Sequence, residues 1–330
     1  MTKPIGPLCN LDCKYCFYLE KEKLFPKNEN YWMNDEVLET YIRNYTQSQN
    51  TPEIQFAWQG GEPTLMGLDF FRKVVELQRQ YSDGRSVHNA FQTNGTNLND
   101  EWCEFFACEK FLVGLSLDGP EHIHNRYRVD KGGAGSHEQV MAGLRMLKKW
   151  RVEFNTLSCV THQSPDEAVE IYTFLKQQGV QFMQFIPIVE RVGDRAAHAI
   201  GLDLAAPPDL SSVDNPGAMM PWAISSEGFG EFLIQIFDEW VKADVGQVFV
   251  NLFDVALGAW CGMEPGLCIF SRRCGQAVAI EHDGGVYSCD HYVYPSYFLG
   301  NVMEKSLEEM ICSPAQVKFG NDKWDALPKY

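Results

Sequence analysis

Apolar runs alternate with amphipathic helical patterns through much of the chain. Helical periodicity covers residues 36–48, 69–81, 99–109, 137–150 and 165–178. The apolar runs between these helices are Ile54–Trp58, His88–Gln92, Phe111–Leu117, Val152–Val160 and Gln181–Ile186. This alternation is typical of βαβ units with a parallel sheet. Right-handed crossovers would curl that sheet into a barrel or an open, doubly wound sheet.

The later part of the chain follows a different pattern. Residues 193–226 are rich in Ala, Pro, Gly and Ser and predict an irregular insertion, while 227–243 and 251–260 predict helices. Ala277–Cys289 predicts a hairpin around Asp283-Gly284-Gly285. We therefore expect an α/β domain over 1–225, with the insertion at about 190–226, and a helical linker with a cysteine-containing region over 226–330.

Composition narrows the class of protein. With 330 residues and 45% hydrophobic content, the chain can bury a sizeable core. The formal charge of −16 disfavours nucleic acid, although an acidic surface suits either a basic partner or plain solvation. We find neither an apolar run of 18 residues nor a signal peptide at the start. We expect a cytoplasmic protein that binds neither nucleic acid nor membrane.

The eleven cysteines crowd toward the two ends of the chain, a pattern that indicates metal binding rather than disulfides. Cys9, Cys13 and Cys16 place three thiolates within eight residues. Zinc would need a fourth ligand nearby, whereas a four-iron cluster accepts three thiolates and keeps one iron open. The aromatic residues Phe17 and Tyr18 would shield a cluster from water. The alternative is three unmetallated core cysteines.

Polar motifs at the ends of predicted strands are further candidates, because α/β folds place their active sites there. QGGEP, TNGT and SLDGP occupy these positions. Gly60 and Gly61 would let a ligand approach the backbone, and Glu62 could orient neighbours or accept from an ammonium group, although GGxP is also an ordinary turn. Ser116 and Asp118 share one strand face and would bind hydroxyls or a carboxylate, or close a turn.

Further candidates lie outside these motifs. Arg128 is either solvated or a carboxylate clamp. Cys268, Cys274 and Cys289 form a second set, with Cys261 close by, and are either metal ligands or buried apolar cysteines. Asp290 follows the hairpin and is either a general base or a turn former.

Several segments together resemble a known family. KPIGPLCNLDCKYCFYLEKEKLFP, FAWQGGEPTL, FQTNGT, LVGLSLDGP, QFIPIVE and CDHYV are similar to the anaerobic sulfatase-maturating enzymes of the radical S-adenosylmethionine (SAM) superfamily. These enzymes carry a cysteine-rich C-terminal region of the SPASM type. The resemblance runs from residue 3 to residue 330 and implies a partial (β/α)6 TIM-like barrel followed by that region.

The resemblance also implies an activity and its partners. Members of the family oxidise a Cys or Ser of an unfolded or nascent sulfatase, in a motif of the form Cys/Ser-x-Pro/Ala-x-Arg, to Cα-formylglycine. SAM cleavage gives a 5′-deoxyadenosyl radical that removes a hydrogen from the target Cβ. The implied cofactors are a [4Fe–4S] cluster, SAM and auxiliary [4Fe–4S] clusters, with flavodoxin or ferredoxin as electron donor.

Residue roles follow from the matched motifs. The resemblance assigns Cys9, Cys13 and Cys16 to the SAM-cleaving cluster and Cys268, Cys274 and Cys289 to an auxiliary cluster. It assigns Gly60, Gly61, Glu62, Ser116, Arg128, Tyr18 and Val189 to the SAM pocket. Asp290 matches the residue proposed to take the substrate proton.

The chain departs from the family pattern at its ends. The family continues past a motif like LPKY into closely spaced cysteines, whereas this sequence stops at Tyr330 and starts only eight residues before Cys9. We therefore expect a truncated chain with an incomplete auxiliary site and uncertain competence. Two other functions remain open: a different SPASM-type enzyme that modifies peptides, for example by forming thioethers, and a non-catalytic iron–sulfur or zinc protein.

Overall fold

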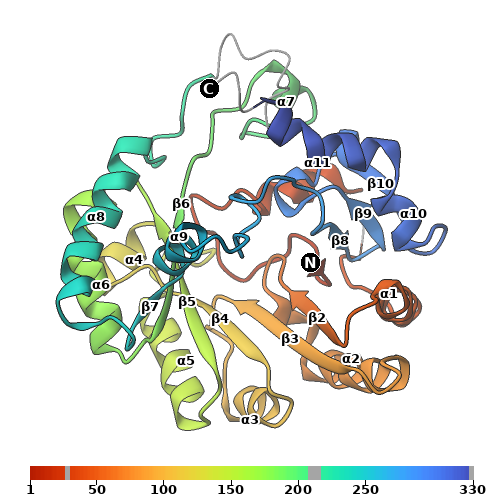
Figure 1. Ribbon diagram of the computed structural model, residues 1–330, viewed down its shortest axis with the longest axis horizontal. Coiled ribbons are helices and arrows are strands. Elements are labelled where there is room, and N and C mark those ends of the chain that lie inside the picture. The colour runs from red at the N-terminus through yellow and green to blue at the C-terminus, as the bar shows by residue number, and fades with distance from the viewer. Residues whose placement is uncertain (27–29, 207–216, 327–330) are drawn as a thin grey trace.

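The computed structural model describes residues 1–26, 30–206 and 217–326, and one curved sheet organises this part of the chain (Figure 1). The strand order is β10-β9-β8-β1-β2-β3-β4-β5-β6-β7. Strands β1 to β7 run parallel to one another. The sheet curls without closing, and helices cover its outer face. The expected partial barrel is confirmed.

The elements agree closely with the hydrophobic pattern. The parallel strands are β1 Thr2–Lys3, β2 Glu53–Trp58, β3 Ser86–Thr93, β4 Leu112–Ser116, β5 Phe154–Val160, β6 Phe182–Pro187 and β7 Phe249–Val250. The helices are α1 Asp35–Ser48, α2 Leu68–Tyr81, α3 Asp100–Cys108, α4 Glu121–Tyr127, α5 His137–Lys149, α6 Ala168–Gln177, α7 Arg195–Ala199, α8 Ser226–Ala243, α9 Asn251–Trp260, α10 Leu307–Ile311 and α11 Pro314–Ala326.

Local chemistry explains where several helices begin. Asn34 accepts a hydrogen bond from the backbone N–H of Val37, and Asn99 does the same for Trp102, so both cap their helices. Pro165 lies in a 3-10 turn ahead of α6, which therefore starts three residues later than its periodicity predicts. Between helices and sheet lies one large apolar core that includes Phe91, which is fully buried.

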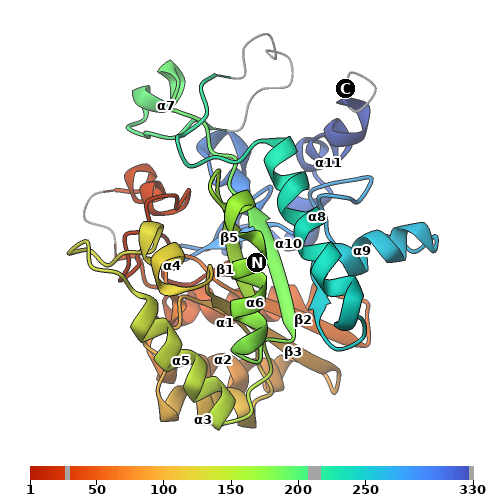
Figure 2. The ribbon, with the colours of Figure 1, turned by 90° about the vertical axis from the view of Figure 1, so that its left-hand side faces the viewer.

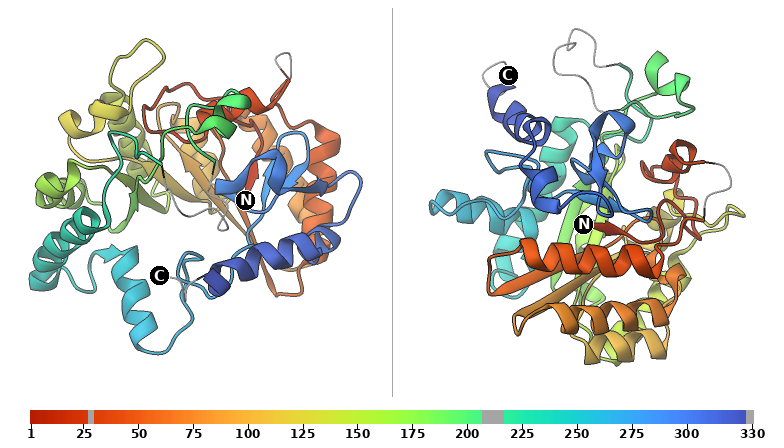
Figure 3. Two further views of the ribbon diagram at one scale, coloured as in Figure 1. Left: turned by 90° about the horizontal axis from the view of Figure 1, so that it is seen from above. Right: turned by 90° about the vertical axis from the view of Figure 1, so that its right-hand side faces the viewer.

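The C-terminal region continues the same sheet. Hairpin strands β8 (Ala279–Glu281) and β9 (Gly285–Tyr287) are antiparallel, and β10 (Phe298–Asn301) extends them. Strand β1 pairs with β2 on one side and with β8 on the other, so it joins the barrel to the hairpin. Figure 3 shows the N-terminus beside this blue C-terminal segment.

Some elements lie where the sequence predicted none. The strands β1 and β7 have two residues each, too few to show periodicity. Within the irregular insertion, helix α7 lies beyond the end of β6 (Figure 2), whereas residues 207–216 lie outside the described residues. The LPKY motif at 327–330 also lies outside them. No helix in the described ranges is long and apolar enough to cross a membrane.

Candidate active site

The first cysteine set lies on the loop that follows β1. Cys9, Cys13 and Cys16 are each half-buried and line one cavity of about 570 Å³. Burial raises the pKa of the Cys9 and Cys13 thiols to about 12 each, and it also raises the pKa of Cys16. A bound metal deprotonates such thiols and offsets this cost. Three thiols lining one cavity therefore fit an iron–sulfur cluster with three protein ligands.

The backbone of the QGGEP motif holds this loop in place. The backbone N–H groups of Gly61 and Glu62 donate to the carbonyl oxygens of Gly6 and Leu8, both at 2.8 Å. A Cβ added at Gly61 would lie 1.8 Å from the Leu8 oxygen. The close approach expected of a ligand is thus made by the chain's own cysteine loop, and the contacts of Gly60 and Gly61 with SAM stay predictions.

Glu62 is fully buried and joins the ends of β2 and β3. Its Oε1 accepts from the backbone N–H and the hydroxyl of Thr64, at 3.0 and 2.6 Å, and from the Thr93 hydroxyl at 2.8 Å. Its Oε2 accepts from the Asn94 backbone N–H at 2.8 Å. Burial raises the pKa of Glu62, and these hydrogen bonds oppose that shift. Glu62 orients its neighbours, which is one of the two roles expected; binding an ammonium group stays a prediction.

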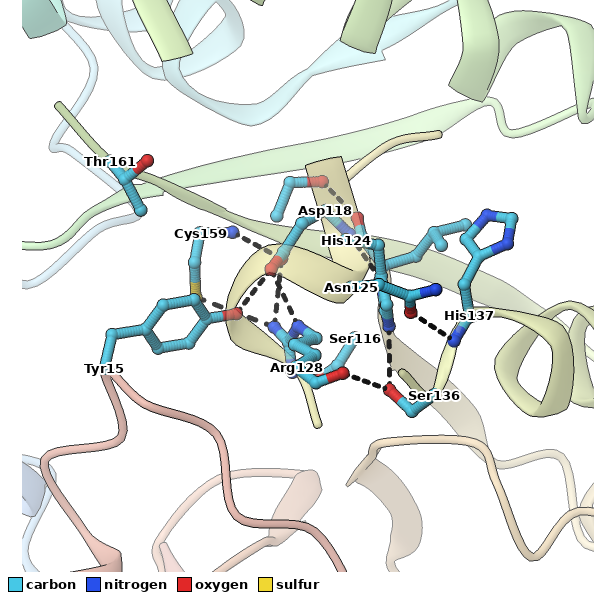
Figure 4. A network of polar contacts seen from close by, with 12 residues as sticks. Tyr15, Ser116, Asp118, His124, Asn125, Arg128, Ser136, His137, Cys159 and Thr161 are labelled. Atoms are coloured by element: carbon cyan, nitrogen blue, oxygen red, sulfur yellow. Dashed lines mark hydrogen bonds and ion pairs between the residues drawn. The ribbon is translucent and has the colours of Figure 1, made fainter. Parts of the chain in front are cut away.

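Arg128 is buried and clamps a carboxylate (Figure 4). Its Nε donates to Asp118 Oδ2 at 2.9 Å and its Nη2 donates to Oδ1 at 3.1 Å. The Tyr15 hydroxyl and the Cys159 backbone N–H also donate to Asp118. Burial alone would raise the pKa of Asp118, but the Arg128 charge holds that pKa below its ordinary value. No local pattern predicted this pair, because Asp118 precedes Arg128 by ten residues and helix α4 lies between them.

Ser116 lies at the end of β4, next to this cluster. Its Oγ accepts from the Gln92 side-chain amide of β3 at 3.1 Å. Ser116 and Asp118 therefore lie at the C-terminal end of β4, and Arg128, which follows α4, reaches Asp118 there. This edge of the sheet is where α/β folds bind their ligands.

Asp290 lies against the first strand. Lys3 Nζ is 2.5 Å from Asp290 Oδ1, and 3.7 Å from the centre of the Tyr18 ring. The Tyr18 hydroxyl donates to Glu281 of the hairpin. Burial alone would raise the pKa of Asp290, but the Lys3 charge, His291 and a hydrogen bond from Gln59 keep that pKa below its ordinary value. Asp290 is thus held as a carboxylate.

Lys3 and Gln59, which both contact Asp290, were not among the candidates. Lys3 is separated from Asp290 by 287 residues, and no local pattern connects them. Gln59 belongs to the QGGEP motif, so its place before the two glycines was the only available signal.

Val189 lines a small cavity beside this group. The cavity, of about 180 Å³, is bounded by Phe17, Val189, Glu190, Arg191, Leu204, Ala205, His291 and Tyr294. Its lining therefore includes residues from the cysteine loop, from the segment after β6 and from the segment after Asp290. Tyr18, Val189 and Asp290 therefore come from three distant segments that meet near one another.

The second cysteine set follows α9. Cys268 is exposed, whereas Cys274 and Cys289 are half-buried. Burial, helped by the charges of Asp290, Cys268 and Cys274, raises the pKa of Cys289 to about 11. Nearby thiols of this kind suit a cluster, although no three His, Cys, Asp or Glu side chains in the described ranges are arranged to hold a single metal ion. Their ligand roles stay predictions.

Family models match both regions. The Radical SAM superfamily model matches residues 4–175, more than half of the chain. The SPASM model, an iron–sulfur cluster-binding domain, matches residues 268–329.

Individual relatives agree. A serine-type anaerobic sulfatase-maturating enzyme of Bacteroides thetaiotaomicron is 44% identical over 99% of this chain and 78% of its own length. A cysteine-type enzyme of Clostridium novyi is 33% identical over 97% of this chain and 80% of its own. The solved structure described as native anSMEcpe with bound AdoMet and Cp18Cys peptide is 31% identical, with a TM-score of 0.84 over 98% of this chain and 82% of that one. The chain therefore belongs to the anaerobic sulfatase-maturating enzymes of the radical SAM superfamily.

Proposed function

We propose that this chain oxidises a Ser or Cys side chain of a sulfatase polypeptide to Cα-formylglycine. The observation that carries the proposal is the position of Asp290. This largely buried carboxylate is ion-paired to Lys3, in the strand that leads directly into the cysteine loop. A proton acceptor beside the radical-generating loop is what this oxidation needs. Family membership supports the same activity.

The cysteine loop and the strand ends would bind the cofactors. Cys9, Cys13 and Cys16 would hold the [4Fe–4S] cluster, and Cys268, Cys274 and Cys289 an auxiliary one. When bound, these clusters and SAM supply the radical chemistry that removes a hydrogen atom from the target Cβ, and an acceptor for the remaining electron. Gly60, Gly61, Glu62, Ser116, Arg128, Tyr18 and Val189 would surround SAM.

Asp290 would act as the general base. The target loses a hydrogen atom from Cβ, a proton from its hydroxyl or thiol, and one electron. The proton passes to the Asp290 carboxylate, and a C=O or C=S double bond forms. A seryl target gives the aldehyde directly, and a cysteinyl target gives a thioaldehyde that water hydrolyses. Asp290 suits this role because its lowered pKa keeps it deprotonated before the reaction.

Serine is the preferred target in this proposal. Three serine-type relatives are 35–44% identical, and the cysteine-type relatives from two Clostridium species are 32–33% identical. The resemblance further suggests a nascent or unfolded sulfatase as substrate, a flavodoxin or ferredoxin as reductant, and a cytoplasmic setting. Free cysteines throughout the described residues are compatible with that setting.

The test is an anaerobic assay with reconstituted iron and sulfide, SAM and dithionite. Two peptides that differ only in Ser or Cys at the target position are followed by mass spectrometry, together with 5′-deoxyadenosine. Formylglycine from both peptides, faster from the seryl one, would support the proposal. Deoxyadenosine with unchanged peptides from a cluster-loaded protein would refute it, and faster turnover of the cysteinyl peptide would refute the serine preference.

A further inference from the structure

Lys3 and Asp290 form a buried ion pair at the junction of the two regions. The side chains of Lys3 and Asp290 are only 2% and 18% exposed, with 2.5 Å between Nζ and Oδ1. Lys3 comes from β1, and Asp290 begins the 3-10 turn after β9. A buried lysine loses its hydration, so it persists only with a partner that compensates for that loss.

The backbone of Lys3 has little freedom to move. In the sheet register Lys3 pairs with Glu281 of β8, and Thr2 pairs with Trp58 of β2. A Cβ added at Gly60 would lie 3.3 Å from the Lys3 Cβ, so the QGGEP turn also packs against it. Strands β2 and β8 on its two sides and the QGGEP turn therefore hold β1 in place.

The ammonium group is fixed as well. It lies over the Tyr18 ring at 3.7 Å, a cation–π contact that is strong when desolvated. The Tyr18 hydroxyl in turn donates to the buried Glu281, whose other oxygen lies 3.5 Å from His282 Nδ1. These contacts hold the ammonium group of Lys3 beside Asp290.

We propose that Lys3 is a positioning residue for Asp290. The proposal rests on the general-base role proposed above for Asp290. By holding Oδ1, Lys3 orients the carboxylate so that Oδ2 receives the proton of the target side chain. Lys3 does not touch the substrate; it fixes the angle and place of the group that does.

The test compares Lys3→Met, Lys3→Arg and the control Lys242→Met in the cluster-loaded enzyme. Lys242 makes a solvent-exposed ion pair with Glu239 within α8, so its replacement removes a charge of the same kind away from the site. The measured quantities are iron content, deoxyadenosine formed without peptide, the ratio of formylglycine to deoxyadenosine, and kcat and KM for the peptide.

Lys3→Met should retain iron and peptide-independent deoxyadenosine formation, while its product ratio falls about tenfold or more through kcat at unchanged KM. Lys3→Arg should lie between, about threefold below the unsubstituted enzyme, because its charge is displaced along a longer side chain. Lys242→Met should keep the original ratio. An unchanged ratio in Lys3→Met would overturn the proposal.

Two further comparisons keep the test decisive. If Lys3→Met fails to hold its cluster, Lys3→Arg carries the test, and an unchanged ratio there overturns the proposal. Asp290→Asn is assayed in parallel. Full formylglycine formation by Asp290→Asn would remove the general-base assignment itself, whereas product loss in Asp290→Asn with an unchanged ratio in Lys3→Met would overturn only the role of Lys3.

Discussion

Gly61 lies so close to Leu8 that a single added methyl group would come within 1.8 Å of the Leu8 carbonyl oxygen. The neighbouring N–H of Glu62 donates to this same oxygen at 2.8 Å. The residue after Leu8 is Cys9, the first cysteine of the triad. The absence of a side chain at position 61 is therefore a condition for the position of the cysteine loop.

The variant Gly61→Ala should consequently lose most of its iron after reconstitution. The clash is with backbone, which cannot move aside as a flexible side chain would, and overpacking of this kind costs about 1–3 kcal/mol or more. Iron analysis and the visible absorption of the cluster measure the effect. Gly230→Ala is the control, because nothing lies within 4 Å of a Cβ added there in α8. Equal iron in both variants would contradict the prediction.

Cys13→Ala should abolish SAM cleavage, since two thiolates would remain where the cluster needs three. Cys108→Ala is the matched control, because Cys108 is exposed at the end of α3 and lines no site described above. Deoxyadenosine formation is the measurement. A Cys13→Ala variant that still cleaves SAM would show that the triad is wrongly assigned.

Arg128→Met should destabilise the protein strongly. It leaves the buried carboxylate of Asp118 without its cation, a loss that typically costs about 3–5 kcal/mol. Unfolding by urea measures the change, and SAM affinity measured separately should fall as well. Arg72→Met is the control: Arg72 is exposed and pairs with Asp69 and Glu101 at the surface, so its loss should alter stability little. Similar destabilisation in both variants would exclude a special role for the buried pair.

Stability should fall as the pH is lowered through the ordinary range of histidine. Burial lowers the pKa of His124 to about 3, whereas an unfolded histidine titrates at about 6.5. Between these values only the unfolded state binds the proton, so the free energy of unfolding falls as pH decreases, by about 1.4 kcal/mol per pH unit once well below 6.5. His124 bonds Asp118 and Ser136 on its two nitrogens, which holds it neutral.

Urea unfolding at pH 7.5 and at pH 5.5 tests this dependence. His124→Gln should show a shallower loss of stability between the two pH values, even if it is less stable at both. His122→Gln is the control, since His122 is exposed beside Glu170. An unchanged pH dependence in His124→Gln would assign the effect to other groups.

The sequence by itself determined the features that depend on near neighbours along the chain. Hydrophobic periodicity located the helices and longer strands, because each of these elements repeats its burial pattern over several turns or residue pairs. The cysteine triad was recognisable because its three ligands lie within eight residues. The motifs at the strand ends indicated where the site would lie, because parallel strands share one carboxyl edge.

Only the tertiary structure decided which charges meet. Arg128 faces Asp118 rather than solvent, since a turn and a short helix bring them together. Lys3 meets Asp290 because a two-residue strand, too short for any periodic signal, inserts between β2 and β8. Gly61 proved to pack against the cysteine loop, because the backbone that approaches it closely belongs to Leu8, far away in sequence. Contacts of this kind depend on sheet register and packing, which no local pattern of residues specifies.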